Sequence, residues 1–178
     1  MKQIKKTKKQ ESGRSMIEMV GVLAVMGLIT AGAFVLISSA MRSQKISRAD
    51  DDISAIAAGV RLLYNTSENF SGVAGSDSGV STLKVLGYNN VTPPYGSGSY
   101  ALTECKPTTN SDGVLTSCTK NSTPANNTHF AITFPMGTDQ GQCNTLAKRT
   151  WAGSGTGICV AGSGNNPTYT VQVMFGKE

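Results

Sequence analysis

The chain has 178 residues, about one domain's worth, and only 15% of them are charged, against roughly 25% in an ordinary soluble domain. Its formal charge of +5 comes almost wholly from residues 1–13, which hold five of the 16 basic residues and one of the 11 acidic ones. The remainder is nearly neutral, which argues against a body with a basic face for nucleic acid. A single histidine leaves little material for a histidine-based metal site or catalytic centre.

The first predicted element is a membrane-spanning segment at residues 19–41, which contain no charged residue. A helix of this length is ~34 Å long and spans the hydrocarbon core of a bilayer. By the positive-inside rule the basic N-terminus stays in the cytoplasm and the bulk of the chain lies on the far side. A removable secretory signal has a shorter apolar core. The alternatives from the residues alone are an uncleaved signal anchor or cleavage after Ala33.

The helical pattern continues beyond the apolar segment, and no proline interrupts it before residue 93. We therefore predict one helix from about Ile17 to Tyr64, apolar all round in its first half and amphipathic in its second. The consecutive acids Asp50, Asp51 and Asp52 point in different directions on a helix and are interpreted as a solvated face. The second half must bury its apolar side against the rest of the chain, and that side comprises Ile46, Ala49, Ile53, Ile56, Val60 and Leu63.

Beyond residue 65 the composition shifts to Gly, Ser, Thr and Asn, which predicts a connecting region over 65–99 with one helical turn at Val80–Leu86. A short second helix is predicted within Asp139–Thr150. His129 falls in a predicted strand and is interpreted as a sheet residue. The expected fold class is α+β, a long helix packed on the apolar face of an antiparallel sheet. Its strands are predicted at Ser99–Thr103, Val114–Thr119, Thr128–Phe134, Gly157–Ala161 and Thr168–Phe175.

All four cysteines follow the membrane segment and so lie on the exported side, where an even number favours disulfides. No C-x-x-C pair occurs, so a compact zinc site is a weaker reading. The sequence permits three pairings. We favour Cys105–Cys118 and Cys143–Cys159, because each links neighbouring segments across a turn-rich stretch.

The junction between the leader and the apolar segment reads Glu11-Ser-Gly13-Arg14-Ser-Met-Ile-Glu18. A Lys-rich leader ends in Gly13, and a lone Glu18 then stands at the start of an uncharged helix. This pattern resembles the class III signal of type IV prepilins, and the resemblance is specific for residues 1–64. It implies that a prepilin peptidase cuts between Gly13 and Arg14 on the cytoplasmic side and methylates the new N-terminus.

The resemblance also gives Arg14 and Glu18 their roles in assembly. It implies that Glu18, buried among the apolar helices of a filament, pairs with the N-terminal amine of Arg14 in a neighbouring subunit. Arg14 departs from the family's pattern, in which the first mature residue is usually apolar. The alternative interpretation, which does not use the resemblance, is that Glu18 is an interfacial residue at the end of a signal anchor. The expected filament-core residues are Met19, Val20, Val22, Leu23, Val25, Leu28, Ile29, Phe34 and Leu36.

The pilin resemblance implies a leader at 1–13, a helix at 14–64 with a membrane or filament-core part at 19–41 and an amphipathic part at 42–64, a connecting loop region at 65–99, and a sheet with a disulfide-closed C-terminal segment at 100–178. We interpret Gly21, Gly27 and Gly32 as positions where helices approach closely rather than as sites of unwinding.

The function implied is that of a structural subunit of a bacterial type IV pilus, nearest to the type IVb or thin-pilus pilins, with no catalysis or cofactor of its own. The filament would serve adhesion, aggregation or conjugative contact. The partners implied are further copies of the chain in a helical polymer, the prepilin peptidase, the inner-membrane assembly platform with its ATPase, and membrane lipid before assembly. No direct nucleic-acid binding is expected. The precursor would lie in the inner membrane and the mature chain in an extracellular pilus.

Two alternatives remain at the level of the sequence. A minor pilin, or a pseudopilin of a type II secretion system, would carry the same leader. A signal-anchored periplasmic enzyme or binding protein predicts no leader cleavage and tolerance of Glu18→Ala.

Overall fold

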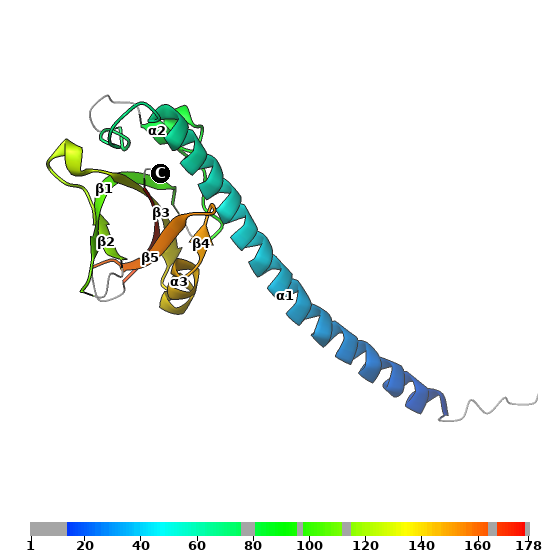
Figure 1. Ribbon diagram of the computed structural model, residues 1–178. Helices are drawn as coiled ribbons and strands as arrows, with labels where there is room; N and C mark the ends of the chain where they lie inside the picture. Colours follow the sequence, from blue (N-terminus) through cyan, green and yellow to red (C-terminus); the bar gives the residue numbers. More distant parts are fainter. Residues whose placement is uncertain (1–13, 76–80, 96–97, 112–114, 164–166, 177–178) are drawn as a thin grey trace, which may run out of the picture. The chain divides into compact units, whose positions relative to one another are not determined.

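The computed structural model describes residues 14–178 except 76–80, 96–97, 112–114, 164–166 and 177–178. The expected leader therefore lies outside the described residues. The chain divides into two compact units, Met1–Gln44 and Lys45–Glu178. Helix α1 (Arg14–Leu63) passes from the first unit into the second (Figure 1). It begins three residues before the predicted start and ends one residue before the predicted end.

The second unit is an α+β arrangement, as expected: the end of α1 packs on a six-stranded sheet in which all neighbouring strands are antiparallel. The strand order is β2-β1-β3-β6-β5-β4. The remaining elements, in chain order, are α2 (Thr82–Val85), β1 (Ala101–Thr109), β2 (Leu115–Thr119), the 3-10 helix η1 (Pro124–Asn126), β3 (His129–Gly137), α3 (Gln140–Ala147), β4 (Thr150–Trp151), β5 (Gly155–Ala161) and β6 (Tyr169–Gly176).

The main core lies between α1 and the two central strands, β3 and β6. Ala49, Ile53, Ile56 and Val60 of α1 are completely or almost completely buried. They pack into one cluster with alternate residues of the strands, as the period of two in those strands predicts. The strand residues of this cluster include Phe130, Ile132 and Phe134 of β3 and Val171, Val173 and Phe175 of β6.

The prediction for Leu63 was wrong. Its side chain is 49% exposed, and Tyr64 packs against the core instead. A straight helix has 3.6 residues per turn, so a seam with a period of 3.5 drifts around it by about 20° per heptad. The residue that faces the sheet beyond Val60 is therefore Tyr64, four positions later, and not Leu63, three positions later.

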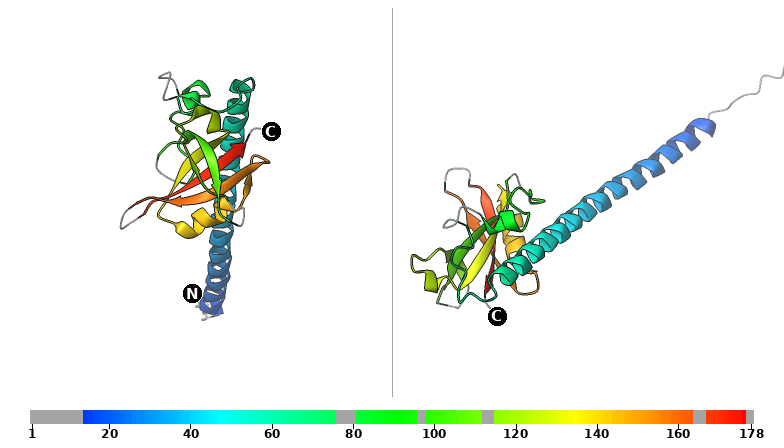
Figure 2. Two further views of the ribbon diagram at one scale, coloured as in Figure 1. Left: turned by 60° about the vertical axis from the view of Figure 1, so that its left-hand side comes forward. Right: turned by 90° about the horizontal axis from the view of Figure 1, so that it is seen from above.

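The opposite face of the sheet, which was not predicted to be covered, is also partly buried. The sheet curls so that β2 approaches β5 (Figures 1 and 2). Inside the curl lies a second, smaller cluster made of Cys105, Cys118, Ala131 and Met174, with Leu115 and Ile158 packed against it.

Several element bounds differ from the predictions. Strand β1 runs on to Thr109 because its second half pairs with β2, where Pro107 lies opposite Cys118. Strand β4 was not predicted, since two residues are too short to show a period. Helix α3 is shorter than its predicted range, and Asp139 caps it by accepting a 2.9 Å hydrogen bond from the Gln142 N–H. Val80 and Val114 lie outside the described residues.

Candidate assembly surface

Residues 19–41 of α1 present an apolar surface that contains no charged residue. All nine residues predicted as filament core lie on it, and their side chains are between 57% and 78% exposed. Burying one large apolar side chain contributes about 1.5–3 kcal/mol. The helix is long and apolar enough to cross a membrane by length and composition. This surface therefore requires an apolar cover, from lipid or from other helices.

Two hydroxyl groups inside this apolar segment, those of Thr30 and Ser38, bond to its own backbone. Thr30 Oγ1 donates to the carbonyl oxygen of Met26 at 2.7 Å, and Ser38 Oγ donates to that of Val35 at 2.9 Å. These bonds satisfy the hydroxyl hydrogens without water. The segment can thus enter an apolar environment without leaving these donors unpaired.

Glu18 is the only charged residue between Met16 and Met41. Its side chain lies on the same helix face as Gly21, because residues three apart are neighbours on the helix surface. A Cβ at Gly21 would meet no atom within 4 Å, so the face is open beside the carboxylate. A shallow groove results, lined by Glu18, Gly21, Val22, Val25, Met26 and Ile29.

The other residues assigned to processing and assembly are only partly described. Helix α1 begins at Arg14, whose side chain is not described, and Gly13 lies outside the described residues. The pairing of Glu18 with the amine of Arg14 from another subunit stays a prediction. So does close helix packing at Gly27 and Gly32, where an added Cβ would also meet no atom of this chain within 4 Å.

The aspartates of α1 correct the prediction of a solvated face. Asp50 Oδ1 accepts a 3.1 Å hydrogen bond from the Ala152 N–H, and Asp52 Oδ2 accepts one of 2.9 Å from the Tyr100 hydroxyl. Burial of the phenol, and then its hydrogen bond to Asp52, raise the pKa of Tyr100. Only Asp51 is exposed as expected. These bonds fasten the second half of α1 to the residue before β1 and to the β4–β5 turn.

Glu104 is a buried carboxylate that sequence reasoning missed. Its side chain is 2% exposed, pairs with Lys120 Nζ at 2.5 Å and accepts a hydrogen bond from the Gly72 N–H. Gly72 has a φ of +82°, a conformation that favours glycine. Glu104 thus ties the connecting region to β1. Its place two residues after the buried Leu102 was the signal that it faces inward.

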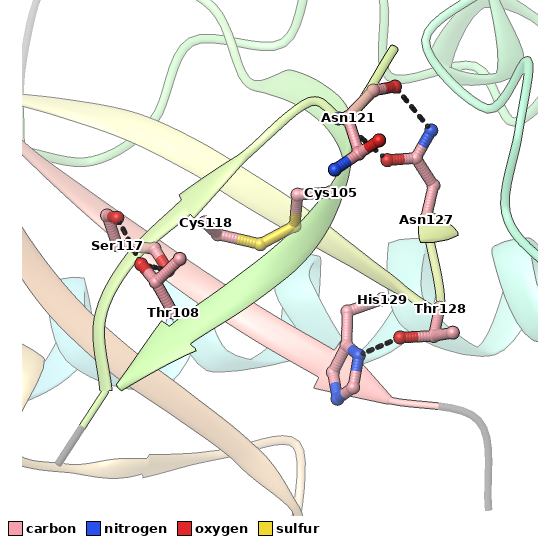
Figure 3. Close-up of a disulfide and its surroundings, with 8 residues drawn as sticks. All are labelled: Cys105, Thr108, Ser117, Cys118, Asn121, Asn127, Thr128 and His129. Atoms are coloured by element: carbon pink, nitrogen blue, oxygen red, sulfur yellow. Dashed lines mark hydrogen bonds between the residues drawn. A yellow bond between two sulfur atoms is a disulfide. The ribbon is translucent and has the colours of Figure 1, made fainter. Parts of the chain in front are cut away.

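The favoured disulfide pairing is present in the structure. Cys105 is joined to Cys118 and Cys143 to Cys159, with Cα–Cα distances of 5.3 and 5.6 Å. The first bridge links β1 to β2 within the smaller core, beside the hydrogen-bonded pair Asn121 and Asn127 (Figure 3). The second fastens α3 to β5. In the chain-entropy model each contributes about 3 kcal/mol to stability.

His129 lies in β3, as predicted, and its Nδ1 is 2.9 Å from Thr128 Oγ1 (Figure 3). Burial lowers its pKa. Within the part of the chain that the structure describes, no group of three His, Cys, Asp or Glu side chains is placed to hold a metal ion.

We compared the chain with known protein families, curated proteins and solved structures. No family model matches the chain, and no curated protein or solved structure does.

Proposed function

We propose that this chain is a structural subunit of a bacterial type IV pilus. After cleavage between Gly13 and Arg14 it polymerises through the apolar first part of α1. The observation that carries the proposal is Glu18, a single carboxylate in an exposed apolar helix face, beside the opening at Gly21.

A carboxylate at this place favours assembly over simple anchoring. A charge drawn into an apolar environment costs several kcal/mol unless it is paired. Cleavage after Gly13 creates an amine about one helical turn before Glu18. The same amine in a neighbouring copy supplies the missing partner, and the pair sets the axial register between copies. The apolar side chains around Glu18 bury one another once the copies are assembled.

The second unit supports this role because it can serve as the body of an exported subunit. The apolar side of its part of α1 is buried on the sheet, and two disulfides cross-link β1 to β2 and α3 to β5. Such bonds persist in oxidising surroundings outside the cytoplasm. In a filament with an apolar core this unit forms the outer surface, which makes adhesive or cell-to-cell contacts.

A minor pilin or a type II secretion pseudopilin would use the same cleavage and the same Glu18 contact. The abundance of the chain in filaments sheared from the cell surface separates them, since only a major subunit dominates that fraction.

The first experiment determines the N-terminus and mass of the protein from cells with and without prepilin peptidase. We expect a chain that begins at Arg14, ~14 Da heavier where a methyl group is added. Gly13→Leu should block the cut, whereas the matched control Ser12→Ala should not. A chain that still begins at Met1 beside an active peptidase would overturn the proposal and leave a signal-anchored domain.

The second experiment tests assembly through Glu18. Glu18→Ala should be processed normally and remain in the membrane but yield few or no filaments. Glu11→Ala removes an equal charge from the leader, which is discarded before assembly, so it should leave filaments unchanged. Normal filaments from Glu18→Ala would refute polymerisation through this residue.

A further inference from the structure

The second unit contains a polar pocket that none of the roles above uses. Its lining residues come from the last turn of α3 and from the β4–β5 hairpin, and its volume of about 670 Å³ is within the range of small-molecule sites. Gly157 shapes it, because a Cβ there would lie 2.7 Å from the Ala147 carbonyl oxygen and would push α3 away from β5. Its polar lining comprises Asn144, Lys148, Arg149, Thr150, Ser154 and Thr156.

The charge of the pocket is one-sided. Lys148 and Arg149 are the only charged residues in 140–176, and both are exposed. Among the described residues neither makes a salt bridge, and no carboxylate lines the pocket. Asp50 contacts the hairpin at Ala152 but is not part of the lining. A guanidinium and an ammonium side by side favour an oxyanion, which Arg binds with two parallel hydrogen bonds.

A third cation, Arg61, contacts the lining residue Ser154. Arg61 Nη2 donates a 3.0 Å hydrogen bond to Ser154 Oγ, and the guanidinium lies 5.6 Å from the centre of the Phe175 ring. A hydroxyl that accepts this bond keeps its own hydrogen for a second partner. Ser154 is therefore oriented as a donor, and Arg61 adds positive charge beside it.

We propose that this pocket binds an anionic sugar unit, a pyranose that carries a carboxylate or a sulfate, as part of an acidic polysaccharide. The volume exceeds what a bare oxyanion fills, and the hydroxyl and amide groups suit the hydroxyls of a sugar. No aromatic ring lines the pocket, so it offers no platform for stacked nucleobases. Two lining cations also give a much weaker field than a nucleic-acid surface requires.

The test measures binding by calorimetry on the full chain in detergent micelles, so it does not depend on cleavage or polymerisation, and its failure leaves the proposed function intact. The probes are glucuronate, glucose 6-sulfate, neutral glucose, inorganic sulfate and a short DNA duplex. We expect Kd values on the order of 1 mM for the two anionic sugars. Glucose and inorganic sulfate should bind at least about tenfold more weakly.

Variants locate the site. Lys148→Gln and Arg149→Gln should each weaken glucuronate binding about tenfold. Lys84→Gln is the matched control, because it removes the same charge from an exposed position on α2. The single tryptophan gives a second readout, since Trp151 Nε1 donates to the Leu146 carbonyl at the end of α3. Its indole N–H resonance should shift with glucuronate in the wild type and not in Arg149→Gln.

Three results would overturn the proposal. These are equal binding of glucose and glucuronate, equal binding of inorganic sulfate and glucose 6-sulfate, or binding that both variants leave unchanged. Tight DNA binding that the variants abolish, in the absence of sugar binding, would replace it with a nucleic-acid site.

Discussion

The backbone N–H of Ala152 donates a 3.1 Å hydrogen bond to Asp50 Oδ1, which joins the β4–β5 turn to α1 across 102 residues of sequence. Ala152 has a φ of 45°, which is rare for a residue with a side chain. The backbone conformation of this turn is therefore unfavourable for alanine, and the Ala152 amide in it is directed at α1. The bond holds the β4–β5 turn against the second half of α1.

Asp50→Ala should therefore lower the free energy of unfolding by about 1–2 kcal/mol relative to Asp51→Ala. Both changes give the same gain in helix propensity, so their difference isolates the bond to Ala152. Denaturant unfolding of the full chain in detergent, followed by near-UV circular dichroism, measures it. Equal stability of the two variants would mean that the bond contributes nothing.

Tyr100 predicts how stability changes at high pH. Its folded pKa is raised above the ordinary 10.0 by burial and by the bond to Asp52, so the folded state favours the neutral phenol. The resulting stabilisation is complete below about pH 10 and is lost as the pH rises above that value.

Absorbance at the tyrosinate wavelength should show one tyrosine that ionises only as the protein unfolds. Tyr100→Phe should remove that late component and cost about 1 kcal/mol at neutral pH through the lost bond to Asp52. Tyr169→Phe is the control, since Tyr169 is only partly buried and does not contribute to the shift at Tyr100. Ionisation of all five tyrosines before unfolding would contradict the expectation.

The Glu104–Lys120 pair predicts a loss of stability when its exposed partner is removed. Lys120→Met leaves the buried carboxylate without its cation and should destabilise the second unit by about 2–3 kcal/mol, less than a fully buried pair would cost. Lys106→Met, an exposed lysine on β1, should change stability by less than about 0.5 kcal/mol. The Gly72 amide donates a hydrogen bond to Glu104, so its hydrogen exchange should accelerate in Lys120→Met and not in Lys106→Met.

Gly157 predicts a packing defect. A methyl group there meets the backbone of Ala147 at 2.7 Å, so Gly157→Ala should cost about 1–3 kcal/mol and loosen the end of α3. Gly141→Ala, inside the same helix, meets its nearest neighbour at an ordinary 3.5 Å and should be neutral or stabilising. Thermal unfolding of the two variants compares them, and equal melting temperatures would refute close packing at Gly157.

The sequence alone determined the elements whose signal is local. The run without charges in 19–41 predicts a helix that can span a membrane, and periods of three to four and of two predict the second half of α1 and strands β3 and β6. The sequence permitted three disulfide pairings and favoured the one that the structure shows, because each bridge in it links neighbouring segments across a turn-rich stretch. The position of Glu18 in its apolar surroundings is likewise a property of the sequence, because one helix carries both.

Only the tertiary structure decided the contacts between distant parts of the chain. It showed that Tyr64, and not Leu63, packs against the sheet. It also showed the hydrogen-bond partners of Asp50 and Asp52 and the burial of Glu104 beside Lys120. It also curled the sheet around a second core and formed the pocket at Lys148 and Arg149. Periodicity reports which face of an element is apolar, but the rotation, register and curvature that select its partners arise only when the elements pack together.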